Sequence, residues 1–177
     1  MKKISLIILS TVILLPAFSQ SLPKDSETKK VCYSGVINSG TRSKTETAEM
    51  ILNWITDFNA IRGQFGALYY NNENGTIKTT LSLNVTQNLK TTLWWINAAV
   101  YYKVSDGEVM YKITNFYTYS SVTTYRNLYA GETPQYVTPL EENNMFNIED
   151  VSKTNDYAKI LNDQVTIVIA SLEELFK

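Results

Sequence analysis

Regular alternation of apolar and polar side chains along three consecutive segments constrains the fold of this chain most strongly. The alternation runs through residues 76–86 and 93–104, and the dipeptide Asp106-Gly107 joins the second segment to a third over residues 108–119. Asp-Gly favours the tight turns of two-residue hairpins. Because successive side chains of a strand point to opposite faces, this period of two predicts an antiparallel sheet with one packed face and one open face.

Two more strands and a helix are expected before these segments. Strands are predicted over residues 29–37 and 67–70, where apolar residues again alternate or turn residues follow. Between them, Ser43 and Glu46 have the spacing of a capping box, in which the side chain of each residue accepts a hydrogen bond from the backbone amide of the other. The helix that follows is predicted to run to Ile61, because its apolar residues recur at helical spacing.

The chain is predicted to close with a second amphipathic helix over residues 152–176. Residues from about 120 to 150 have no clear period and are predicted to form an irregular insertion. Both apolar helix stripes must be buried against one face of the sheet. The predicted fold is therefore an α+β two-layer sandwich, a five-stranded antiparallel sheet with two helices on one face, in the order β-α-β-β-β-β-α.

The first nineteen residues have the pattern of a secretory signal peptide. Met1-Lys2-Lys3 is positively charged, an apolar stretch follows, and Ala17-Phe18-Ser19 offers small residues for cleavage. Residues 1–19 are thus predicted to be removed, residues 20–28 to form a polar leader, and residues 29–177 to form one domain. The expected location is the periplasm or the cell surface, with no membrane span after cleavage.

Composition weakens several classes of function. The chain has no histidine, which removes the commonest metal ligand and the usual general base at neutral pH. Its single cysteine, Cys32, cannot form an internal disulfide. Without the signal peptide, 14 basic and 17 acidic side chains give a net charge of −3. Nucleic-acid binding is not expected, because phosphate recognition calls for a dense basic surface.

The acidic side chains gather towards the C-terminus. Residues 20–129 carry a net charge of +3, whereas residues 130–177 carry −6.

Four segments resemble the domain-of-unknown-function family 4468, a family with a TBP-like fold found in exported proteins of Gram-negative, Bacteroidota-type bacteria. They are the first strand (residues 30–37), the helical Asn53-Trp54-Ile55, the hairpin of residues 99–107 and 111–116, and Pro139-Leu140-Glu141. The resemblance spans roughly residues 22–177 and implies a TBP-like fold. It implies no activity, because the family has no established function and no known catalytic residues.

The open face of the predicted sheet is the leading candidate site. If the even-numbered residues of 93–104 pack beneath the helices, the odd-numbered ones form an aromatic and hydroxyl-rich platform with their neighbours. Such a surface suits binding of a protein or a glycan of the cell envelope, or of a second copy of the chain. The candidate binding residues are Trp95, Asn97, Tyr101, Lys103, Lys112 and Phe116, with Tyr125 and Tyr129 of the irregular segment.

These residues predict an exported, non-enzymatic binding or interaction domain. The alternative is a hydrolase acting on envelope glycan or peptide through carboxylates at residues 141–142, 149–150 or 173–174. Glycosidases hold two carboxylates across a cleft, and the sequence does not pair any. No catalytic residue, metal site or cofactor is predicted.

Overall fold

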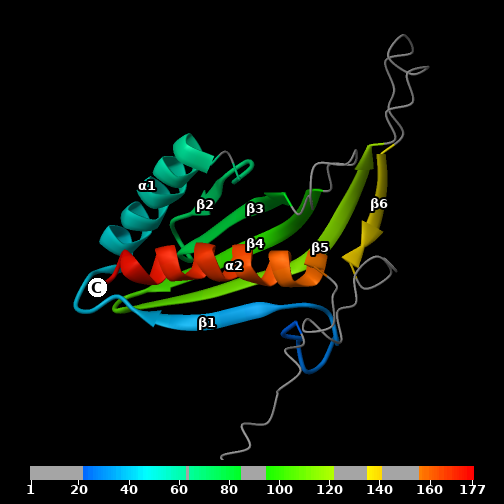
Figure 1. The fold of residues 1–177 in the computed structure, drawn as a ribbon. Coiled ribbons are helices and arrows are strands. Elements are labelled where there is room, and N and C mark those ends of the chain that lie inside the picture. The colour runs from blue at the N-terminus through cyan, green and yellow to red at the C-terminus, as the bar shows by residue number, and fades with distance from the viewer. Residues whose placement is uncertain (1–21, 63, 85–94, 122–134, 141–155) are drawn as a thin grey trace, which may run out of the picture.

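The computed structural model describes residues 22–62, 64–84, 95–121, 135–140 and 156–177. The chain forms a single antiparallel sheet with two helices, α1 and α2, lying on one side of it (Figure 1). The strands are β1 (Tyr33–Asn38), β2 (Tyr69–Asn71), β3 (Thr76–Asn84), β4 (Trp95–Ser105), β5 (Glu108–Ser121) and β6 (Gln135–Pro139), and the helices are α1 (Lys44–Arg62) and α2 (Asp156–Glu174).

The strands lie in the order β1-β5-β4-β3-β2, and every pair is antiparallel. Strand β5 is the longest. It pairs with β4 along one edge and with two strands, β1 and β6, along the other. β1 pairs with its first half and β6 with its last five residues. The predicted two-layer α+β architecture, with a five-stranded antiparallel sheet and two helices on one face, is confirmed. The short strand β6 is additional, and it falls in the stretch that the sequence predicts to be irregular.

Helix α1 begins where the sequence predicts. The Ser43 amide donates to a Glu46 carboxylate oxygen at 2.9 Å, and the Glu46 amide donates to Ser43 Oγ at 3.3 Å. These reciprocal bonds satisfy amides that a helix start leaves without partners. A further cap comes from the hairpin between β4 and β5, because Asp106 Oδ1 accepts from the Lys44 amide at 2.7 Å.

The core lies between the sheet and the helices. On the sheet side it is built by alternate residues of each strand, as in β4, where Ile96, Ala98, Val100, Tyr102 and Val104 are buried and their odd-numbered neighbours are not. The helices contact each other as well as the sheet. The Trp54 indole Nε1 of α1 donates to Ser171 Oγ of α2 at 3.1 Å. Both helical stripes are therefore buried on the same sheet face.

A β-bulge interrupts the pairing of β4 with β5. Asn97 pairs with Tyr117 and Ala99 pairs with Thr114, so that the two residues Asn115 and Phe116 lie opposite the single residue Ala98. Asn115 has a φ of 52°, a left-handed conformation that asparagine adopts more readily than most residues. An extra residue in one strand reverses which side chains face each layer beyond that point.

The chain before β1 folds into a turn that packs against the domain. Leu22 is fully buried, and Lys24 pairs with Val31 in an antiparallel bridge. Asp25 closes the turn by accepting from the amides of Glu27 and Thr28. Much of the segment that the sequence marks as a polar leader is thus built into the domain.

Among the described residues, no helix has the length and apolar character needed to cross a bilayer. Cys32 is buried with a free thiol.

Candidate functional site

The open face of the sheet carries most of the predicted site residues. Trp95 is 40% exposed and Tyr101 is 37% exposed. Lys103 and Lys112 are exposed, and Asn97 is half-buried beside Ser82, whose hydroxyl donates to its side-chain oxygen. The structure brings these five predicted residues onto one face, on strands β4 and β5.

Phe116 does not belong to this face, and the prediction that its side chain lies there is wrong. Its side chain is 2% exposed and contacts the Tyr33 ring edge-on in the core, with 5.9 Å between ring centroids. The cause is the bulge at Asn115, which turns Phe116 towards the helices. Tyr117, paired with Asn97, takes the place on the open face that simple alternation assigns to Phe116.

Tyr125 and Tyr129, the two predicted residues of the irregular segment, lie outside the described residues. The carboxylates at residues 141–142 and 149–150 also lie outside them.

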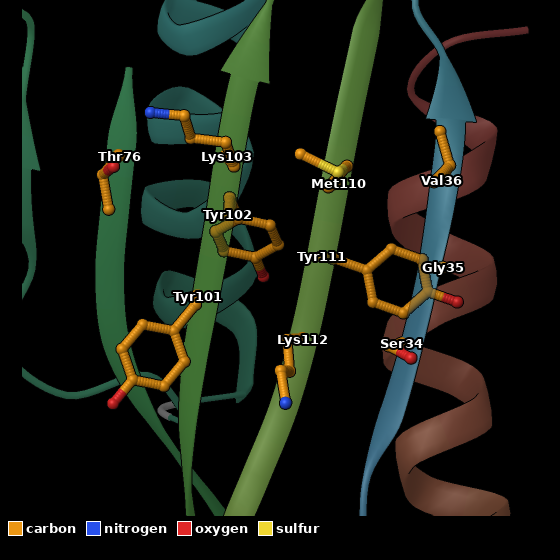
Figure 2. A pocket seen from close by; sticks show the side chains of 10 residues that line it. All are labelled: Ser34, Gly35, Val36, Thr76, Tyr101, Tyr102, Lys103, Met110, Tyr111 and Lys112. Atoms are coloured by element: carbon orange, nitrogen blue, oxygen red, sulfur yellow. The ribbon is translucent and has the colours of Figure 1, made fainter. Parts of the chain in front are cut away.

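A hollow of about 550 Å³ opens on this face at the β1 end of the sheet. Figure 2 shows the sheet with the helices behind it and the lining side chains drawn as sticks. The hollow crosses strands β3, β4, β5 and β1, and it is lined by Ser34, Gly35, Val36, Thr76, Tyr101, Tyr102, Lys103, Met110, Tyr111 and Lys112. Volumes of this order are typical of small-ligand sites.

Register explains which side chains line the hollow. One row across the strands reads Thr76, Lys103, Met110 and Val36, and the next reads Lys78, Tyr101, Lys112 and Ser34. Met110 and Val36 are 45% and 62% exposed, so they form an apolar patch beside the lysines. Sequence reasoning did not include Val36 and Ser34 in the site, because only the pairing of β1 with β5 places them there.

Tyr101 has two lysines beside it in the register and a third in the next row. Lys78 on β3 and Lys112 on β5 are its direct cross-strand partners, and Lys103 lies two residues along the same strand. The Lys78 ammonium lies 5.8 Å from the centre of the Tyr101 ring, a cation–π distance. Lys103 Nζ donates to the Asn74 carbonyl oxygen.

Asp25 supplies a carboxylate to this group of lysines. Its Oδ2 lies 3.3 Å from Lys112 Nζ, and hydrogen bonds from the Thr28 and Glu27 amides and from Lys112 hold its pKa down at about 2. The same contact raises the pKa of Lys112. Both groups therefore stay charged at neutral pH.

A second, smaller hollow of about 240 Å³ adjoins the first and shares Tyr101 with it. Its lining includes Tyr69 of β2, which is 56% exposed and pairs directly with Lys78. The sequence predicted the strand but gave no reason to place Tyr69 on the open face. The two hollows together extend the site from β1 to β2.

The lining of the two hollows does not contain the pair of carboxylates on which the hydrolase alternative depends. The lining residues include no aspartate, glutamate, histidine or cysteine. Within the described parts of the chain, no cluster of three or more such side chains could hold a metal ion. The exposed aromatic rings, apolar side chains and ammonium groups are instead suited to binding.

No family model and no curated protein matches this sequence. Solved structures do match. The crystal structure of a TBP-like protein from Parabacteroides distasonis ATCC 8503 aligns with a TM-score of 0.62 over 87% of this chain and 96% of that chain, at 15% sequence identity. The fold of this chain is TBP-like.

A second solved structure has the same arrangement. A DUF4468 family protein from Bacteroides ovatus ATCC 8483 aligns with a TM-score of 0.61 over 88% of this chain and 90% of that chain, at 10% identity. The TBP-like fold predicted from the four sequence segments is confirmed by these likenesses. A fold does not define a binding partner, so the function has to be argued from the residues of the open face.

Proposed function

We propose that this chain is an exported, non-enzymatic binding domain of the DUF4468 family and that it takes its ligand on the open face of the sheet. Family membership is supported by the likeness to a DUF4468 protein and by the sequence segments that resemble the family. Export is supported by the charged, apolar and small-residue regions of residues 1–19.

The observation that carries the proposal is the concentration of exposed apolar side chains on one face. Eight large hydrophobic side chains are exposed among the described residues, and five of them lie on the open face. Such patches on a folded domain usually mark a site of interaction. The five are Val36, Tyr69, Trp95, Tyr101 and Met110.

The helix layer explains why the other face needs no partner. Alternate residues of β3, β4 and β5 are buried beneath α1 and α2, so the core is complete on that side. The side chains of the open face add little to the core. We therefore expect several of them to be replaceable without loss of folding, as is usual for exposed positions.

Site-specific photo-cross-linking in the producing bacterium tests the proposal. A benzophenone side chain replaces Met110 on the open face or, as a matched control, Ile167 on α2; the two positions are 45% and 47% exposed. We expect a defined adduct from position 110 and none from position 167. The adduct should be lost when Tyr101→Ala is added, because the Tyr101 ring lines the same hollow.

Equal labelling from the two positions, or no adduct from position 110, would contradict binding on the open face. The same cells test export separately. The chain in the envelope fraction should begin near Gln20, and an uncleaved chain in the cytosol would contradict export.

A further inference from the structure

Aromatic rings and ammonium groups alternate along one line across the open face. Tyr69 of β2, Lys78 of β3, Tyr101 of β4 and Lys112 of β5 are successive partners in the register. Neighbouring strands lie about 5 Å apart. The rings of Tyr69 and Tyr101 are therefore two strand spacings apart, with Lys78 between them. The line passes through both hollows, which share Tyr101.

Positive charge exceeds negative charge along this line. Lys78 and Lys112 flank Tyr101 in the register and Lys103 lies in the next row; of these three lysines, only Lys112 has a carboxylate partner, Asp25. This line therefore carries unbalanced positive charge beside solvent-exposed rings, and Glu108, one row beyond Met110, is a further carboxylate on the open face. A ligand that placed anionic groups here would gain Coulomb energy from more than one ammonium group.

Hydroxyl groups lie on both sides of the line. Ser34 continues it on β1, Thr76 lies in the adjacent row, and Thr80 lines the smaller hollow. Ser34 and Thr80 are exposed. These side chains can donate and accept hydrogen bonds, as a ligand rich in hydroxyl groups requires.

We propose that this line of residues binds an acidic glycan, a chain of sugar units that bear carboxylates. The flat faces of the sugar rings stack on Tyr69 and Tyr101, where C–H groups of the sugar meet the aromatic ring. The carboxylates lie against Lys78, Lys103 and Lys112. The inference rests on the proposed binding role of the open face and specifies its ligand.

Other ligand classes fit the same residues less well. A neutral glycan would leave the ammonium groups without a counterpart. A nucleic acid strand would also stack on aromatic rings, but such binding depends on a dense basic groove. This chain has a net charge of −1, and three lysines form its cationic cluster on the open face. An acidic peptide would satisfy the lysines but would not need two exposed tyrosine rings.

Calorimetric titration of the purified full chain tests the inference with defined probes. Oligogalacturonate supplies acidic sugar units, and its methyl ester is the matched neutral control. We expect the acid form to bind and the ester to bind at least about tenfold more weakly, because each exposed ion pair contributes a few-fold to affinity. Binding of the acid form should weaken as salt is raised from 0.05 to 0.5 M, because salt screens the attraction between the exposed lysines and the carboxylates of the glycan.

Variants locate the binding on the predicted residues. The double substitution Lys78→Gln and Lys103→Gln should lower affinity for oligogalacturonate by about tenfold. Lys159→Gln removes the same kind of charge from α2 and should leave the affinity unchanged. Tyr69→Ala should weaken binding of the acid form, because it removes one of the two stacking rings. Circular dichroism of each variant confirms that it is folded.

Four results would overturn the inference. One is equal binding of the acid and its methyl ester. Another is tighter binding of oligothymidylate or of oligoglutamate, which would assign the face to nucleic acid or to acidic peptide. A third is loss of affinity in Lys159→Gln as large as in the lysine pair. If no oligogalacturonate binds while position 110 still cross-links in cells, the glycan inference fails and the proposed binding face remains.

Discussion

Asn115 determines which side chains of β5 reach the site. It adopts a φ of 52° where β5 has one residue more than β4 between paired positions. Beyond it the alternation is reversed, so Phe116 packs against Tyr33 in the core and Tyr117 pairs with Asn97 on the open side. The composition of the open face thus depends on one backbone conformation.

Substitution of Asn115 tests this dependence. A β-branched residue opposes the left-handed conformation, so Asn115→Val should lower the free energy of unfolding by about 1–2 kcal/mol. Asn115→Gly should stay close to wild type, because glycine adopts a positive φ without steric cost. Urea denaturation of the three proteins measures the difference. Equal stability of the valine and glycine variants would show that the bulge is not needed.

Simple alternation could not predict the bulge, but the sequence contains a sign of it. Between Val109 and Ile113, the inward-facing side chains of β5 follow one another every two residues. Ile113 and the next one, Phe116, are three residues apart. A period-two reading assigns Phe116 to the open face. Phe116 is an apolar residue at a position that alternation assigns to the open face, and it follows an asparagine, which tolerates positive φ. This combination indicates a bulge that reverses the alternation.

At the scale of elements, local patterns predicted helix and strand positions well. The first helix was expected to start after Ser43, and α1 runs from Lys44 to Arg62 because the capping box forms. The bond from the Lys44 amide to Asp106 could not be predicted, since its partners are 62 residues apart. Strand β6 was not expected either, because it has only five residues and its pairing depends on the far end of β5.

The turn before β1 is a separate element that is tied to the open face. Asp25 accepts from the Thr28 and Glu27 amides within the turn and from Lys112 on β5. These contacts lower its pKa from an ordinary value of 3.8 to about 2. A carboxyl group whose pKa is lower in the folded state stabilises the fold above its unfolded pKa.

Unfolding measured against pH tests this contact. We expect wild type to be more stable than Asp25→Asn at pH 6, where the carboxylate is charged and accepts its hydrogen bonds. The advantage should shrink as pH falls from about 4 and be lost near pH 2, as the folded-state carboxyl group is protonated. Guanidinium or thermal unfolding of both proteins gives the comparison. A difference between them that does not change over this window would contradict the assignment.

At the scale of the whole molecule, the two layers carry different charge. The open face presents Lys78, Lys103 and Lys112, all from the part of the chain with a net charge of +3. Helix α2 belongs to the C-terminal part, which has a net charge of −6. The charge asymmetry of the sequence therefore corresponds to a difference between the open face and part of the helix layer.

The sequence predicted the face of the site but not its shape. Alternation placed Trp95, Tyr101, Lys103 and Lys112 on the open side without knowledge of strand order. The two hollows could not be predicted without the strand order, because Val36 of the larger hollow and Tyr69 of the smaller one come from strands that only the folded sheet places beside β5 and β3. Side-chain direction is a local property, whereas neighbouring strands are set by the whole chain.

The most direct test of the binding face is lysine acetylation in the native envelope. The acetylation rates of Lys78 and Lys103 are measured by mass spectrometry in envelope preparations and in the purified chain, with Lys159 on α2 as the internal control. We predict that Lys78 and Lys103 react more slowly in the envelope than in the purified chain, because ligand covers the open face, while Lys159 reacts equally in both. Equal rates at all three lysines in the two preparations would contradict the claim that the open face is the occupied surface.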